Sequence, residues 1–199
     1  GLGDVYKRQP GNDYMYGVAY NTTAKTFETT QPIADNGHRA SDSKGEKINL
    51  GLKHAFCLVS LKFKKHTDYI GPCNLTKITY SRPIPTLQTN GTTTMSLKDG
   101  ALGNLTGAKA GTQVKYEYTV NGGVTVAATT DGIEFINYGV PFPSGTANVT
   151  AATLTVVVDG KEMKLDTITD GGEWSAGNKY TYTISIHGTG LKLDGFNVV

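Results

Sequence analysis

The sequence predicts an all-β protein, built as a sandwich of two antiparallel sheets, and three observations support this. Short runs rich in Thr, Val, Ile and Tyr alternate between apolar and polar residues with the period of two that β-strands require. Glycine is frequent, with 25 among 199 residues, and turn sequences containing it separate these runs. Helical periodicity is nearly absent, so the sequence offers no candidates for the crossover helices that a parallel sheet needs. We therefore expect two packed antiparallel sheets with about seven strands.

The first expected strand is the aromatic segment 13–20, DYMYGVAY. The polar, Thr-rich stretch from Asn21 to Gly45 is interrupted by Pro32, and we interpret it as a linker or a long loop. From residue 48 onward apolar residues alternate and lead into the apolar run AFCLVSLKF. Such a run is typical of a core strand that is covered on both faces, or whose phase is shifted by a bulge. The side chains expected on one face of it are Cys57, Val59, Leu61 and Phe63.

Further strands are expected at sandwich-like intervals, over residues 75–80, 93–97, 113–120, 124–129 and 133–138. Asn121-Gly122-Gly123 lies between two of these runs and predicts a hairpin turn, because Asn and Gly accept positive φ. Asp159-Gly160 is the preferred type I′ pair and predicts a β-hairpin over 152–168. The segment 179–186 alternates without interruption, and a short strand over GLKLDGF closes the chain. The apolar face of 179–186 would carry Tyr180, Tyr182, Ile184 and Ile186.

Composition excludes several classes of partner. A net charge of +2 on a chain with 18% charged residues, whose lysines are scattered, creates no field that would attract nucleic acid or acidic membranes. No run approaches the roughly 18 consecutive apolar residues of a membrane helix, and no signal peptide is visible.

The sequence contains no recognisable catalytic, cofactor-binding or metal-binding motif, so we predict that the protein is not an enzyme and needs no cofactor. The four histidines are far apart in the sequence, and none belongs to an HExxH pair, although they could still converge in the folded chain. We expect His54, which precedes the core strand, to be packed and hydrogen-bonded. The histidines are His38, His54, His66 and His187.

Two further groups of residues leave alternatives open. Cys57 and Cys73 lack additional ligands at zinc spacing, so we expect buried free thiols, with a single bridge between them as the alternative. The tyrosines could form a flat sugar-binding platform, but the single tryptophan, Trp174, is expected in a turn, and this favours cross-strand packing. The tyrosines concerned are Tyr14, Tyr16, Tyr20, Tyr116, Tyr118, Tyr180 and Tyr182.

Three stretches, in this order, carry a resemblance to a known family. The first is NDYMYGVA, residues 12–19, and the second is INLGLKHAFCLVSLKF, residues 48–63, with its His-Ala pair before the core strand. The third is WSAGNKYTYTISIHGTGLKL, residues 174–193, with an Ala-Gly-x-x-Tyr-x-Tyr pattern. Together they resemble the fimbrillin family, the surface-pilus subunits of anaerobic gut and oral bacteria. The resemblance covers about residues 10–199.

The resemblance implies tandem transthyretin-like, Greek-key sandwiches, export as a lipoprotein and attachment to the outer membrane through an N-terminal lipid. It also implies that subunits polymerise by donating a β-strand to the next subunit, in which main-chain hydrogen bonds give adhesion and alternate side chains give register. The implied partners are other fimbrial subunits, with host or bacterial surface glycans or proteins as ligands. The implied function is that of a structural subunit or tip adhesin of a cell-surface fimbria. A carbohydrate-binding module of a glycan-utilisation system is the alternative.

The same comparison suggests three regions. Residues 1–9, GLGDVYKRQ, look like a non-native, adaptor-derived tail from assembled metagenomic reads. Residues 10–44 would be the C-terminal remnant of a first sandwich domain with its linker, and 45–199 a second sandwich domain. We expect residues 10–199, lacking the acceptor groove of a first domain, to be unable to polymerise, so that sizing chromatography shows no long oligomers.

Overall fold

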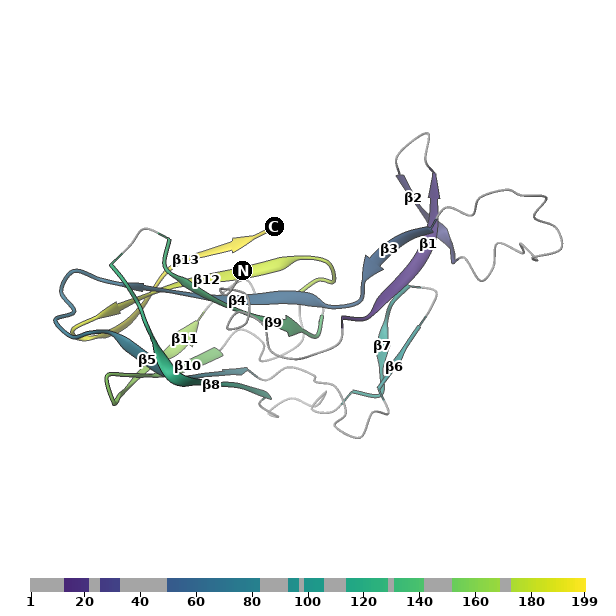
Figure 1. Cartoon of the computed structure of the whole chain (residues 1–199). Helices are drawn as coiled ribbons and strands as arrows, with labels where there is room; N and C mark the ends of the chain where they lie inside the picture. Colours follow the sequence, from purple (N-terminus) through teal and green to yellow (C-terminus); the bar gives the residue numbers. More distant parts are fainter. Residues whose placement is uncertain are drawn as a thin grey trace.

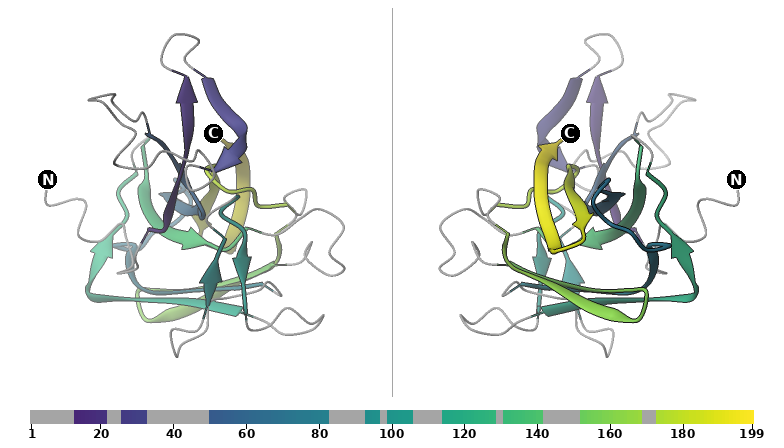
Figure 2. Two further views of the ribbon diagram at one scale, coloured as in Figure 1. Left: turned by 90° about the vertical axis from the view of Figure 1, so that its right-hand side faces the viewer. Right: turned by 90° about the vertical axis from the view of Figure 1, so that its left-hand side faces the viewer.

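The computed structural model describes residues 13–21, 26–32, 50–82, 93–96, 99–105, 114–128, 131–141, 152–168 and 173–199, so the expected tail 1–9 lies outside it. The described segments are strands joined by turns, and two four-stranded sheets pack face to face as a sandwich (Figures 1 and 2). The all-β sandwich that the sequence predicts is therefore confirmed. Within the described residues, no helix has the length and apolar character needed to cross a lipid bilayer.

The first sheet has the strand order β11-β10-β5-β8, and every pair in it is antiparallel. Its β10–β11 hairpin, at one edge of the sheet, is the one that Asp159-Gly160 predicts, and both turn residues have the positive φ of a type I′ turn, 49° and 77°. The strands are β5 (Asn74–Arg82), β8 (Val114–Thr125), β10 (Ala152–Val158) and β11 (Lys161–Ile168).

The second sheet has the order β13-β12-β4-β9, so the described residues contribute eight strands to the sandwich, where about seven were expected. β12 pairs in parallel with β4, although the sequence analysis expected antiparallel neighbours. Alternation specifies which face of a strand is buried but not its neighbour or direction, so this pairing had no local signal. The strands are β4 (Cys57–Lys65), β9 (Ile133–Gly139), β12 (Lys179–His187) and β13 (Gly190–Val198).

A smaller sheet with the order β2-β1-β3 lies at one end of the sandwich (Figure 1). The expectation of a loop throughout 21–45 is wrong in part, because Thr26–Pro32 forms β2 and pairs with β1 (Met15–Asn21). The continuous core strand expected from residue 48 is also two strands: β3 (Leu50–His54) pairs with β1, and β4 begins after a bend at Ala55. β6 (Thr94–Met95) and β7 (Leu102–Gly103) form a short separate ladder.

The hairpin expected at Asn121-Gly122-Gly123 is not formed. β8 continues through these residues and pairs with β5 on both sides of them, from Val114 to Thr125. The extra residues form a bulge, with φ of 80° at Gly122 and 73° at Gly123. Positive φ occurs in bulges as well as in turns. The Gly122-Gly123 pair therefore indicated the backbone conformation correctly, but it did not indicate that the chain would continue in the same direction.

The core lies between the two four-stranded sheets. The inward faces predicted for β4 and β12 are confirmed, since Val59, Phe63, Tyr182 and Ile184 are all buried. Trp174, expected in a turn, is only 1% exposed and joins this core. The largest fully buried side chains are Trp174, Tyr80, Tyr182, Phe63, Phe135, Leu75, Ile78, Leu154 and Ile184.

Both cysteines are buried and free, as expected, and no bridge joins them. The Cys57 thiol donates a hydrogen bond to the carbonyl oxygen of Gly139 at 3.2 Å. Burial raises the pKa of the Cys73 thiol, which keeps it in the less reactive protonated form.

The Asp159 carboxylate ties the β10–β11 turn to the start of β5. It accepts hydrogen bonds from the Tyr69 hydroxyl at 2.6 Å and from the backbone N–H groups of Cys73 and Asn74 at 3.0 and 2.8 Å. The hydrogen bond from Tyr69, followed by that from Asn74, lowers the pKa of Asp159. Burial and the same carboxylate raise the pKa of Tyr69 to about 12.

We expect Asp159→Asn to lower the free energy of unfolding at neutral pH and to lose this effect in acid. Because the folded-state pKa lies below the ordinary value of 3.8, the carboxylate stabilises the fold above that value. This contribution disappears as the pH falls through the folded-state pKa. Urea unfolding of both proteins from about pH 7 to about pH 2 measures the difference.

Asp166→Asn on the same hairpin is the matched control. Its carboxylate pairs with Lys164 at 2.7 Å, but the two side chains are 73% and 56% exposed, so little change is expected at any pH. An Asp159→Asn effect that stays constant between neutral and acidic pH would contradict the assigned role of the charge.

Candidate functional site

Strand edges are the first features of this fold that could bind another protein. β11 is an edge of the first sheet, and its exposed side chains include Lys161, Glu162, Lys164 and Asp166. Charged side chains on an edge disfavour pairing with another strand, so β11 is protected against addition.

β13, an edge of the second sheet, has a different character. Its first half carries Leu191 and Leu193, which pack against the core together with Met163 of the facing β11. In its second half, Phe196 lies opposite Tyr182 and Val198 opposite Tyr180.

Because Tyr180 and Tyr182 point into the core, Phe196 and Val198 also lie on the core side of β13. The ring of Phe196 contacts that of Tyr182, with centroids 5.0 Å apart. Phe196 and Val198 nevertheless remain 37% and 44% exposed. The core is therefore left open at this end of β13.

A groove of about 430 Å³ opens on the outer face of the second sheet. Phe56, Leu58 and Tyr138 give it an apolar lining, and Val199 reaches it from the end of β13. Val199 is held by two backbone hydrogen bonds to Lys179, at 2.8 and 3.0 Å. The groove and the open end of the core therefore lie on opposite faces of the same segment of β13.

Lys179 also lines this groove and forms an ion pair next to it. Lys179 Nζ lies 2.5 Å from Glu134 Oε1, which also accepts a hydrogen bond from the Ser60 hydroxyl. Burial would raise the pKa of Glu134, but the hydrogen bonds from Lys179 and Ser60 outweigh it and lower that pKa. Glu134 is thus kept ionised as part of an ion pair, which is a structural arrangement rather than that of a proton donor.

Two of the histidines that the sequence left scattered come together in the fold. His66 and His187 stack with ring centroids 4.0 Å apart, and Asp68 bonds to both. His54 pairs with Asp13 at 2.8 Å, but its side chain is 51% exposed, so it is hydrogen-bonded as expected without being packed. His38 lies outside the described residues. Parallel pairing of β4 with β12 places His66 beside His187, and no spacing in the sequence could have indicated this.

Of the aromatic residues that suggested sugar binding, Trp174, Tyr180 and Tyr182 are buried, whereas Tyr14 is 43% exposed. The side chains of Tyr20 and Tyr116 lie outside the described ones. Trp174 donates its Nε1 hydrogen to the Tyr182 hydroxyl at 3.2 Å, and both side chains are buried. Tyr180 is 4% exposed, and the Tyr118 hydroxyl bonds to the carbonyl oxygen of Ile136. Among these described side chains cross-strand packing holds, and they form no flat, solvent-facing platform.

Comparison with known proteins gives the family and the fold. The sequence profile of the fimbrillin-like family matches residues 6–198. The crystal structure of a candidate cell adhesion protein from Bacteroides uniformis ATCC 8492 is similar, with a TM-score of 0.51 and 19% identity, over 97% of this chain and 68% of that chain. No curated protein matches the sequence significantly.

Two further solved structures are more distantly similar. A fimbrial protein from Bacteroides vulgatus ATCC 8482 has a TM-score of 0.45 and 11% identity, over 76% of this chain and 56% of that chain. The tip fimbrial protein Mfa3 from Porphyromonas gingivalis, with a C-terminal truncation, has a TM-score of 0.36 and 12% identity, over 76% of this chain and 53% of that chain. The chain thus spans only part of each of these proteins. Because the family profile covers nearly its whole length, the chain belongs to the fimbrillin-like family.

Proposed function

We propose that this chain is a structural subunit of a bacterial cell-surface fimbria and joins its neighbours by β-strand addition. Membership of the fimbrillin-like family supports the fimbrial role. The single observation that supports strand addition is the exposure of Phe196 and Val198 on the core side of an edge strand. An apolar edge of this kind is a template for pairing with another chain.

The occupant we propose is an extended segment of a neighbouring fimbrial subunit with apolar side chains at alternate positions. The side chains on its core face would cover Phe196 and Val198, and its alternate side chains would face outward, where the groove opens beside Val199. Each apolar side chain that it buries contributes roughly 1.5 to 3 kcal/mol before ordering costs are subtracted. A few such side chains, added to main-chain hydrogen bonds, suffice for a durable contact.

The proposal also includes the domain division and the cellular location. We place 10–44 with a preceding domain and 45–199 in the sandwich domain, with the separate β2-β1-β3 sheet as the region where the two meet. We further propose that an N-terminal lipid attaches the fimbria to the outer membrane, and that this subunit lies either at the tip or in the stalk of the fimbria. We assign the chain no catalytic role.

Site-specific photo-cross-linking tests strand addition. A photoreactive amino acid at position 198 should join the chain covalently to a full-length fimbrillin-like subunit, and mass spectrometry should locate the cross-link in an extended apolar segment. Position 197 is the matched control, because successive side chains of a strand point to opposite faces. Equal cross-linking at 197 and 198, or none at 198, would contradict the proposal.

A carbohydrate-binding module remains the second candidate, and a glycan array separates the two. A lectin must bind at least one glycan saturably, whereas a structural subunit shows only strand-mediated contacts with protein. The burial of Trp174, Tyr180 and Tyr182 favours the structural role. Saturable glycan binding by the monomeric chain would reverse this preference.

A further inference from the structure

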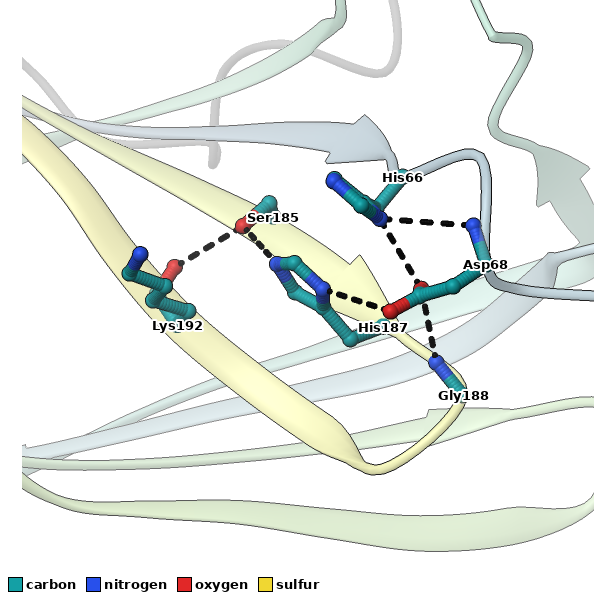
Figure 3. A network of polar contacts seen from close by, with 6 residues as sticks. All are labelled: His66, Asp68, Ser185, His187, Gly188 and Lys192. Atoms are coloured by element: carbon teal, nitrogen blue, oxygen red, sulfur yellow. Dashed lines mark hydrogen bonds and ion pairs between the residues drawn. The ribbon is translucent and has the colours of Figure 1, made fainter.

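The His66–Asp68–His187 cluster lies at the end of the second sheet, outside the surfaces described above (Figure 3). In the parallel pair β4–β12, Lys65 lies opposite Ile186. His66 directly follows the last residue of β4, and His187 is the last residue of β12, so the register places them side by side.

Asp68, in the turn that follows β4, faces both imidazoles. Its Oδ1 lies 3.0 Å from His66 Nδ1, and its Oδ2 lies 3.1 Å from His187 Nδ1. The Gly188 backbone N–H donates to Oδ1 at 3.1 Å, which ties the turn to the β12–β13 connection. One ligand atom from each of the three side chains lies within 4.8 Å of the others.

The hydrogen bonds on the far side of His187 indicate its tautomer. The Ser185 hydroxyl lies 2.8 Å from His187 Nε2 and 3.5 Å from the Lys192 carbonyl oxygen. Because the hydroxyl has one hydrogen and the contact with Nε2 is much the shorter, Ser185 donates to Nε2. The Nδ1–H of a neutral His187 then donates to Asp68 Oδ2 at 3.1 Å.

His66 contacts Asp68 through the same ring nitrogen. Its Nδ1 lies 3.3 Å from the Asp68 backbone N–H and 3.0 Å from Asp68 Oδ1. Two imidazole nitrogens and one carboxylate therefore lie close together at the surface. A metal ion that displaced the hydrogen-bonding protons would be bound by all three groups.

We propose that His66, Asp68 and His187 bind a divalent first-row transition ion, with Zn²⁺ as the best match. Neutral imidazole and carboxylate are zinc ligands, and three protein ligands with an open fourth position form a common zinc geometry. Ligand atoms about 2.1 Å from a tetrahedral ion lie about 3.4 Å apart. Here one ligand atom from each side chain lies within 4.8 Å of the others, so modest side-chain rotations bring them to that spacing. Ser185 supplies the outer hydrogen bond that orients a ligating histidine.

Exposure of the cluster permits an ion to enter. The His66 and Asp68 side chains are 45% and 48% exposed, and that of His187 is 18% exposed. A bound ion would clip the turn after β4 to the end of β12.

Titration of the metal-free chain with ZnCl₂, after removal of any polyhistidine tag, tests the site. We expect one ion per chain by calorimetry and, at zinc about 100-fold above Kd, a rise in Tm of at least about 5 °C. CaCl₂ should give no such rise, because Ca²⁺ prefers oxygen ligands.

Variants show whether these residues are the ligands. His66→Ala and Asp68→Asn, both at exposed positions, should weaken zinc binding by at least about tenfold, and Ser185→Ala by roughly 10- to 100-fold. His54→Ala is the matched control, since the His54–Asp13 pair offers only two ligands. No zinc-dependent shift in the wild type, or equal shifts in His66→Ala, Asp68→Asn and His54→Ala, would overturn the proposal.

Discussion

Trp174→Ala is expected to lower the free energy of unfolding by about 3 to 5 kcal/mol, the usual range for removing a fully buried large aromatic side chain. The indole is 1% exposed and lies between Tyr80 and Tyr180, with ring centroids 6.3 and 6.2 Å away. Its removal leaves a cavity and also deprives the Tyr182 hydroxyl of its hydrogen-bond donor. In a protein of this size the loss corresponds to a fall in Tm of about 6 to 20 °C.

Trp174→Phe separates these two contributions. Phenylalanine retains most of the apolar contact but lacks the N–H donor, so its effect should be clearly smaller than that of alanine. Urea unfolding followed by circular dichroism compares all three proteins, because both variants lack the only tryptophan. A Trp174→Ala protein as stable as the wild type would show that this side chain is not part of the core.

Trp174 also illustrates where sequence patterns stop being informative. The strands around Asp159-Gly160 were predictable because turn chemistry and alternation are local, and each constrains only adjacent residues. Trp174 has no alternating neighbours and lies in a short segment before β12, so no period could assign it to the core. Its burial results from contacts with Tyr80 and Tyr182, which come from strands of different sheets.

The candidate sites depend even more on nonlocal pairing. Alternation in 179–186 correctly predicted the buried tyrosines, but it could not indicate that β4 would be the parallel neighbour of β12. That one pairing brings His66 to His187, and the sequence analysis therefore predicted no metal site. The open core at Phe196 had no sequence signal either, because the pattern shows that a side chain faces inward, not whether another strand covers it.

A substitution at Gly132, where the chain enters β9, tests the fit of this strand against β4. Gly132 has a φ of 65°, and a Cβ there would lie 2.6 Å from the Phe63 carbonyl oxygen and 2.9 Å from Lys64 Cγ. The backbone oxygen cannot move without disturbing β4, whose Phe63 pairs with Ile133. Gly132→Ala is therefore expected to combine about 1 to 2 kcal/mol of left-handed backbone strain with about 1 to 3 kcal/mol of overpacking.

Gly160→Ala is the control that isolates the contact. Gly160 has a similar φ of 77°, but a Cβ there would meet nothing within 4 Å. Both substitutions reduce the conformational freedom of the unfolded chain equally, so this effect cancels in the comparison. Urea unfolding followed by Trp174 fluorescence should show Gly132→Ala to be less stable than Gly160→Ala by about 1 to 3 kcal/mol. Equal losses would mean that β9 can shift away from β4, and that this edge of the second sheet is less tightly held than its register implies.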